Sequence, residues 1–195
     1  MLRWHFVKAG RLGKTEKLSV RYIWMASKET DQYTTRPTSF VESDGTWLTA
    51  ALGIAQKFGV VTDKVLPFKL GGQSQMYTGS ANTFYALAAQ RRIASYFNLG
   101  RNLSAWRNWL ATKGPILTRL DVDDAFMQAT ATKGKLDTYT ANSGLGGHCV
   151  ALVGYVNGRF IVRNSWGTGW GDKGFAHAAD SYAQPAFTEA FGVVL

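Results

Sequence analysis

The spacing of hydrophobic residues changes from helical to strand-like along this chain of 195 residues. Apolar residues at helical spacing predict one clear helix, opened by residues 43–45 and ended by Gly59; they are Trp47, Ala50, Ala51, Ile54 and Phe58. Weaker patterns predict helices over 2–8, 18–27, 82–90 and 104–112. Short apolar runs predict strands over 92–99, 116–122, 150–155, 159–163, 175–178 and 191–194. Helices first and antiparallel strands last indicate an α+β fold.

The composition is that of a globular protein, with 46% hydrophobic and 18% charged residues. No apolar run is long enough to span a bilayer, and residues 1–13 lack the apolar centre of a signal peptide. The net charge of +9 comes from basic residues spread along the chain, so we expect neither a nucleic-acid nor a membrane partner. The single cysteine, Cys149, excludes an intrachain disulfide, and we therefore expect a cytoplasmic location.

Two motifs carry the candidate chemistry. The first is Gly146-Gly147-His148-Cys149, at the start of a predicted strand, and the second runs from Asn164-Ser165-Trp166-Gly167 to Phe175. An asparagine carbonyl can accept a hydrogen bond from an imidazole N–H and turn the other ring nitrogen toward a nucleophile. A histidine and an asparagine on successive strands are therefore typical of the base and orienter of a thiol protease.

The two motifs strongly resemble the C-terminal half of papain-like (C1-type) cysteine peptidases, of the bacterial type. Weaker similarity occurs earlier, at residues 18–22, 44–46 and 114–116. The resemblance implies a single papain-like domain over residues 1–195, with a helical lobe mainly over 1–112 and a β lobe mainly over 113–195. It also implies hydrolysis of peptide or protein substrates, with His148 and Asn164 catalytic and with Trp166 and Gly45 binding substrate. No His, Cys and Asp cluster has metal-ligand spacing, so we expect neither a metal nor another cofactor.

The nucleophile of that family lies in a Gln…Cys segment that opens a long helix, and this chain has no match to it. By the resemblance, residues 2–7 correspond to the end of that helix, which would put the cysteine roughly ten residues before Met1. Cys149 is not expected to replace it, because neighbouring strand residues point to opposite faces and Cys149 would face away from His148. We expect Cys149 to be a small buried residue instead.

Three explanations of the incomplete site stay open. The chain is a truncated form of a real peptidase, inactive alone, which we favour because both motifs are intact. Alternatively, it is a non-catalytic module that binds peptides, or an interaction protein. In the last case a partner or a second copy would cover apolar surface at Trp4, Phe6 and Val7. A small acidic cluster at residues 121, 123 and 124 is expected to be a solvated loop rather than a cation site.

The hairpin between the motifs raises a problem of register. Asn157-Gly158 is a strong signal for a two-residue turn, and strict pairing from it would set Asn164 opposite Ala151. His148 would then lie on the other face of the sheet, and the two side chains could not meet. One residue of register must therefore be absorbed. We expect a three-residue loop over 156–158 to absorb it, with a bulge in the following strand as the alternative.

Overall fold

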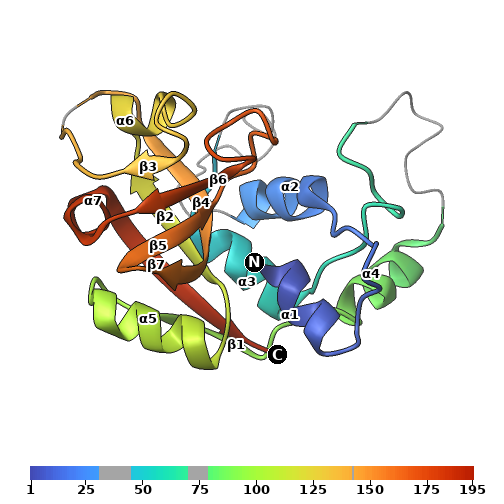
Figure 1. Cartoon of the computed structure of the whole chain (residues 1–195). Helices are drawn as coiled ribbons and strands as arrows, with labels where there is room; N and C mark the ends of the chain where they lie inside the picture. The colour runs from blue at the N-terminus through green and yellow to red at the C-terminus, as the bar shows by residue number, and fades with distance from the viewer. Residues whose placement is uncertain (31–44, 70–78, 142) are drawn as a thin grey trace. The chain divides into compact units, whose positions relative to one another are not determined.

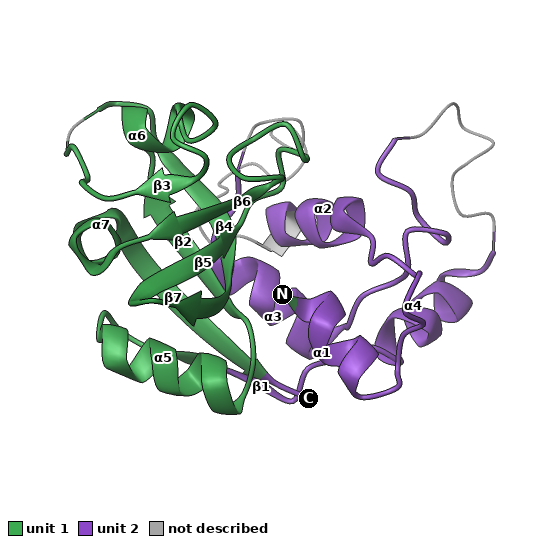
Figure 2. Ribbon diagram, in the orientation of Figure 1, with its two compact units in different colours: residues 1, 97–193 green, residues 2–96, 194–195 purple. Residues whose placement is uncertain are grey.

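The computed structural model describes residues 1–30, 45–69, 79–141 and 143–195 (Figure 1). The chain separates into two compact units (Figure 2). Unit 1 contains Met1 and residues 97–193, and unit 2 contains residues 2–96 and 194–195. The expected lobe boundary at 112/113 therefore differs from the boundary between the units, while the single-domain organisation stays a prediction.

Unit 2 is helical in its described part. Its helices are α1 (Leu2–Lys8), α2 (Val20–Thr30), α3 (Leu48–Lys57) and α4 (Ala81–Ala89), each close to a predicted helix. The hydroxyl of Ser80 caps α4 by accepting a hydrogen bond from the Thr83 amide, so the helix begins one residue before the predicted range. The polar composition of residues 28–42 and 69–80 predicts irregular loops, and most of both ranges lies outside the described residues.

Only part of the apolar surface expected at the first helix is exposed. Phe6 is fully buried, so the prediction of exposure is wrong for that residue, because its ring packs inward from α1. Trp4 is 41% exposed and Val7 is half-buried. Self-association through these residues stays a prediction.

A seven-stranded sheet, most of it in unit 1, has the strand order β1-β7-β2-β4-β5-β6-β3 (Figure 1). The pairs β2–β4, β2–β7, β4–β5 and β5–β6 are antiparallel, and β3–β6 is parallel. With the helices, this sheet confirms the α+β class. The strands are β1 (Ser95–Asn98), β2 (Ile116–Asp121), β3 (Lys135–Leu136), β4 (Gly147–Val156), β5 (Arg159–Arg163), β6 (Phe175–Ala178) and β7 (Phe187–Val194).

Three further helices belong to unit 1: α5 (Leu103–Thr112), α6 (Asp124–Met127) and α7 (Asp180–Ala186). Helix α5 had been assigned to the helical lobe, but it packs on the sheet through Trp106, which contacts Phe160 and Phe187 edge-on. Burial of this large aromatic residue, with 1% exposed, explains the placement of α5. The short elements α6, α7 and β3 were not predicted.

The two faces of the sheet differ, and the difference decides where His148 points. Along β2 the buried residues alternate, with Ile116 and Leu120 both fully buried in the core. His148 on β4 pairs with Leu120, so it stands at the end of this core-facing row. Cys149 pairs with Arg119 and therefore lies on the opposite face.

The register between β4 and β5 contains the irregularity that was predicted, but at another place. The turn is the two-residue Asn157-Gly158, with φ of 48° and 75°, and Val156 pairs with Arg159. Two residues with positive φ match the twist of the flanking strands, so the turn has no need of a third residue. The expected three-residue loop is therefore wrong.

The register shift lies instead within β4, between Leu152 and Gly154, so Val153 is the additional residue. The alternative expectation, a bulge in the following strand β5, is therefore also wrong, because the bulge lies in β4. Beyond the shift Ala151 pairs with Arg163. The same register sets Asn164 opposite Val150, two residues from His148, and brings both side chains to one face.

Candidate active site

The structure joins the side chains of His148 and Asn164. The imidazole Nε2 lies 2.8 Å from the Asn164 carboxamide oxygen, Oδ1. A carboxamide oxygen only accepts, so Nε2 carries the hydrogen and Nδ1 is left to accept or hold a proton. The predicted contact between the two side chains is therefore confirmed. Their catalytic roles stay a prediction at this point.

Asn164 is held on several sides. Its Oδ1 also accepts a hydrogen bond of 2.7 Å from the Ser165 amide, and its own amide donates to the Gly174 carbonyl at 3.1 Å. The residue is only 4% exposed. Its Nδ2 is buried and has no hydrogen-bond partner among the described residues. The oxygen that meets the histidine is therefore fixed, while one donor of the same group is left unsatisfied.

Aromatic rings surround the histidine. The ring centroid of Trp166 lies 4.8 Å from that of His148, and the ring of Phe126 approaches edge-on at 5.7 Å. Trp166 remains 44% exposed, while Phe126 is fully buried. Rings packed against the imidazole in this way limit its rotation.

Phe126 was not recognised from the sequence, although it connects both motifs. Its carbonyl accepts a hydrogen bond of 3.1 Å from the indole of Trp170, and its ring lies 4.7 Å from the same indole. The Asp123 side chain caps the helical turn that carries Phe126. An aspartate three residues before a large apolar residue was the signal that could have predicted this turn.

The backbone conformation of Gly171 and two hydrogen bonds of Thr130 fix the course of the glycine-rich loop 167–174. Gly171 has φ of 61°, and a Cβ there would overlap the Phe175 carbonyl oxygen, so a larger residue does not fit. The Thr130 hydroxyl accepts from the Gly171 amide at 2.9 Å and donates to the Gly169 carbonyl at 3.1 Å. This bridge ties the loop that follows Trp166 to the segment that follows Phe126.

Cys149 is exposed, so the expectation that it is buried is wrong. Cys149 lies on the face of β4 away from His148, as the alternation of side chains predicted, but the residue is exposed on this face. Although the residue is exposed as a whole, the protein around its thiol removes hydration and raises the pKa of Cys149 to about 11, with Glu189 adding to the effect. An activated nucleophile needs a lowered pKa, so Cys149 is unsuited to that role.

The acidic cluster also differs from its prediction. Asp123 is fully buried rather than solvated, because its carboxylate accepts hydrogen bonds from the Phe126 and Thr140 amides and from the Tyr182 hydroxyl. Asp121 forms an ion pair of 2.8 Å with Arg119. In the part of the chain that the structure describes, no group of three His, Cys, Asp or Glu residues could hold a metal ion.

Gly45 is exposed and lies in unit 2, whereas the other predicted site residues lie in unit 1. Its expected role in substrate binding stays a prediction. No helix among the described residues has the length and apolarity needed to cross a membrane.

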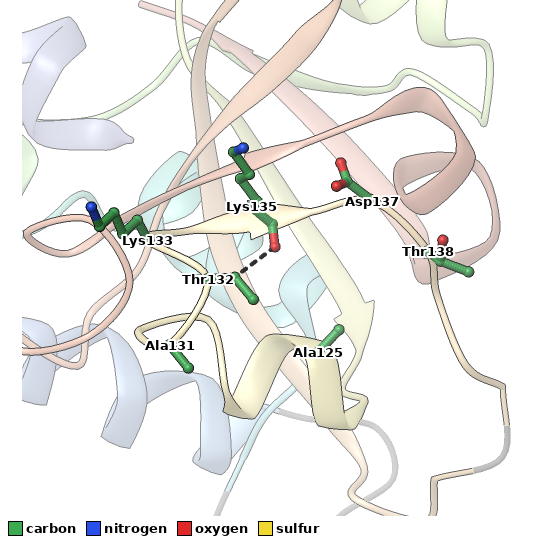
Figure 3. A pocket seen from close by; sticks show the side chains of 7 residues that line it. All are labelled: Ala125, Ala131, Thr132, Lys133, Lys135, Asp137 and Thr138. Carbon is green, nitrogen blue, oxygen red and sulfur yellow. Dashed lines mark hydrogen bonds between the residues drawn. The ribbon is translucent and has the colours of Figure 1, made fainter.

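A pocket of about 540 Å³ lies beside α6 and does not include His148 or Asn164 (Figure 3). In it the Thr132 hydroxyl donates to the Lys135 carbonyl at 3.0 Å. Its lining residues are Ala125, Ala131, Thr132, Lys133, Lys135, Asp137 and Thr138.

Solved structures with the same fold are cysteine proteases. Xylellain from Xylella fastidiosa superimposes with a TM-score of 0.78 at 17% identity, covering 99% of this chain and 75% of that one. Bromelain from Ananas comosus superimposes with a TM-score of 0.65 at 20% identity, covering 98% and 82%. Because the identities are only 17% and 20%, these two structures establish the papain-like fold and nothing further.

Sequence comparisons agree with the fold. Cathepsin B-like CP2 from Giardia intestinalis is 29% identical over 68% of this chain and 45% of its own length. Cysteine proteinase 2 from Entamoeba histolytica is 36% identical over 51% of this chain and 33% of its own length. The chain thus spans less than half of each of these relatives. The sequence model described as "Papain family cysteine protease" matches residues 8–189, and the chain therefore belongs to that family.

Proposed function

We propose that this chain supplies the general base and its orienter to a peptidase that cleaves peptide bonds by Cys-His-Asn chemistry. The observation that carries the proposal is the 2.8 Å hydrogen bond from His148 Nε2 to Asn164 Oδ1, which fixes the tautomer and leaves Nδ1 for proton transfer. Membership of the papain family supports it.

In the proposed reaction His148 accepts and then donates one proton while the thioester forms, and again while the thioester is hydrolysed. The hydrogen of a cysteine thiol passes to Nδ1, and the sulfur bonds to the carbonyl carbon of the substrate. The imidazolium then gives the proton to the amine nitrogen as the C–N bond breaks, which leaves a thioester. Water gives a proton to Nδ1 as it attacks the thioester, and that proton returns to the sulfur when the acid product leaves. Asn164 keeps the ring oriented while its charge changes.

The thiol in this reaction is not that of Cys149, which lies on the other face of β4 and has a pKa raised to about 11. We propose that the thiol belongs to a segment encoded before Met1, and that the present chain is inactive without it. The unsatisfied Nδ2 of Asn164 supports this idea, because an acceptor on an additional segment would remove the cost of a buried, unpaired donor.

The substrates we propose are peptides or proteins, with the exposed ring of Trp166 and the exposed backbone at Gly45 as contacts. The location we propose is the cytoplasm, because residues 1–195 hold a single cysteine and form no disulfide among themselves.

A second candidate function is a peptide-binding module without catalysis. The observation that favours it is that the only thiol of the sequence lies away from His148. Such a module would bind peptides with the present chain alone, and addition of an upstream segment would not create turnover.

One experiment separates the two functions. The coding sequence before Met1 is read, and the extended and present chains are each incubated with a fluorogenic peptide library under reducing conditions. We expect turnover only from the extended protein, with loss of turnover when its upstream cysteine is changed to serine. An upstream sequence without cysteine, or turnover by the present chain that survives Cys149→Ser, would refute the proposed thiol. Peptide binding with no turnover from either protein would favour the module.

A further inference from the structure

Outside the two motifs, the carboxylate of Asp123 is fully buried and accepts three hydrogen bonds. It accepts hydrogen bonds of 3.0 Å from the Phe126 amide, 3.0 Å from the Thr140 amide and 2.7 Å from the Tyr182 hydroxyl. These donors come from α6, from the loop before β4 and from α7. No described ion pair includes Asp123, so the three donors are what compensates its buried charge.

One of these hydrogen bonds connects Asp123 to Phe126, whose ring contacts the His148 imidazole. The bond to the Phe126 amide fixes the start of α6, a helix of only four residues that packing alone would hold weakly. The ring of Phe126 lies 5.7 Å from His148 and 5.5 Å from Trp166. A shift of α6 would therefore move a ring that contacts both the histidine and the tryptophan beside it.

A second hydrogen bond leads to the histidine along the backbone. Thr140 lies in the loop that runs into β4, and Asp123 binds its amide. Farther along the same loop the Ser143 hydroxyl donates to the Val122 carbonyl, and the Val122 amide donates to the Gly146 carbonyl at 2.9 Å. The chain that enters His148 is thus attached to the segment that carries Asp123.

The third donor, Tyr182, has no other hydrogen bond through its hydroxyl in the described structure. The residue is fully buried, and its ring packs edge-on against Tyr139 at 5.8 Å. Burial and the hydrogen bond to Asp123 raise the pKa of Tyr182, so the phenol stays protonated and remains a donor.

We propose that Asp123 and Tyr182 are positioning residues that hold the His148 imidazole in its hydrogen bond to Asn164. Neither residue touches the reacting atoms. They act on the imidazole through the ring of Phe126, and on the backbone of His148 through the bonds at Thr140, Ser143 and Gly146. A positioning role in catalysis depends on the proposed function of His148. The effect of the two residues on the orientation of the imidazole does not depend on catalysis.

The test measures the imidazole itself in the present chain. Solvent exchange of the His148 Nε2 hydrogen is followed by NMR in ¹⁵N-labelled protein, well below the melting temperature. Tyr182→Phe keeps the ring and removes only the hydroxyl, and Asp123→Asn keeps the shape and removes the charge. Ser181→Ala is the matched control, because Ser181 is also on α7 and donates to the Asp137 carbonyl at 2.6 Å without touching Asp123.

We expect exchange of the His148 hydrogen to be about tenfold faster in Tyr182→Phe, as for loss of one buried hydrogen bond, and unchanged in Ser181→Ala. Exchange of the Trp106 indole hydrogen, which is bonded to the Gly100 carbonyl at 3.1 Å, should not change. Equal acceleration of both hydrogens would mean general loosening and would overturn the proposal, as would no acceleration in Tyr182→Phe. If Asp123→Asn does not fold, Tyr182→Phe decides alone. A failure here leaves the peptidase proposal intact, because the peptidase assay does not depend on this exchange rate.

Discussion

His148 donates a hydrogen bond of 2.8 Å to Asn164, and the two residues share one face of the sheet because Val153 is an additional residue in β4 that has no counterpart in β5. On the turn side of Val153 the strands are in the register set by Asn157-Gly158. Beyond it they are shifted by one residue. Since side chains alternate between faces, this single shift decides whether the pair forms.

The turn that begins this ladder should be sensitive to substitution. Gly158 has φ of 75°, so Gly158→Ala should lower the free energy of unfolding by about 1 kcal/mol. Gly154→Ala is the control within the same hairpin, because Gly154 lacks a positive φ and an added Cβ would only touch Ile161. Urea unfolding of both variants measures the difference. An equal effect of both changes would contradict the assigned turn.

The glycine-rich loop offers a second matched pair. Gly171→Ala should destabilise the protein by about 2 kcal/mol, because the new Cβ would overlap the Phe175 carbonyl oxygen at a residue with φ of 61°. Gly169→Ala should have an effect below about 0.5 kcal/mol, since nothing lies within 4 Å of the added atom. Thermal unfolding compares the two variants. Similar melting temperatures would show that the loop does not follow the path described.

Substitution of the buried Asp123 should lower the free energy of unfolding far more than substitution of its exposed neighbour Asp124. Asp123→Ala leaves two amides and a phenol without their acceptor, and should cost about 3 kcal/mol of unfolding free energy. Asp124→Ala lies one residue later on the exposed side and should cost less than about 1 kcal/mol. Chemical denaturation at pH 7 measures both. A small effect of the Asp123 change would argue against its three hydrogen bonds.

Cys149 should react slowly although it is exposed. Its pKa, raised to about 11, keeps the thiol protonated at pH 8, so labelling by an aromatic disulfide should be about a hundredfold slower than in unfolded protein. As the pH is raised toward that pKa, the labelling rate should increase about tenfold for each pH unit, because only the thiolate reacts. Labelling of the native protein as fast as the unfolded one would refute the raised pKa.

The sequence predicted the elements that local patterns specify. The antiparallel strands over 159–163 and 175–178 were predicted to the residue, and four helices of unit 2 were located, because apolar periodicity and glycine stops mark them. The need for one shifted residue between His148 and Asn164 followed from alternation alone. Its position did not, because a bulge at Val153 and a longer turn satisfy the same alternation.

Other features depend on tertiary contacts that local patterns do not encode. Asp123 reads as a surface residue, and only the donors from Thr140 and Tyr182, distant in sequence, make its burial possible. Phe126 lies in a helical turn too short to give a periodic pattern. Cys149 was expected to be buried from the apolar residues that follow it, and its exposure depends on what covers the second face of β4.

The central claim is that His148 is the base and Asn164 its orienter, and kcat/KM of the extended, active protein tests it most directly. We expect His148→Ala to reduce kcat/KM at least about a hundredfold, and Asn164→Ala to reduce it about tenfold with most of the loss in kcat. His177→Ala is the control, because His177 lies on β6 among the strand pairs and not beside Asn164. Retention of full kcat/KM by His148→Ala, or equal losses in His148→Ala and His177→Ala, would contradict the account.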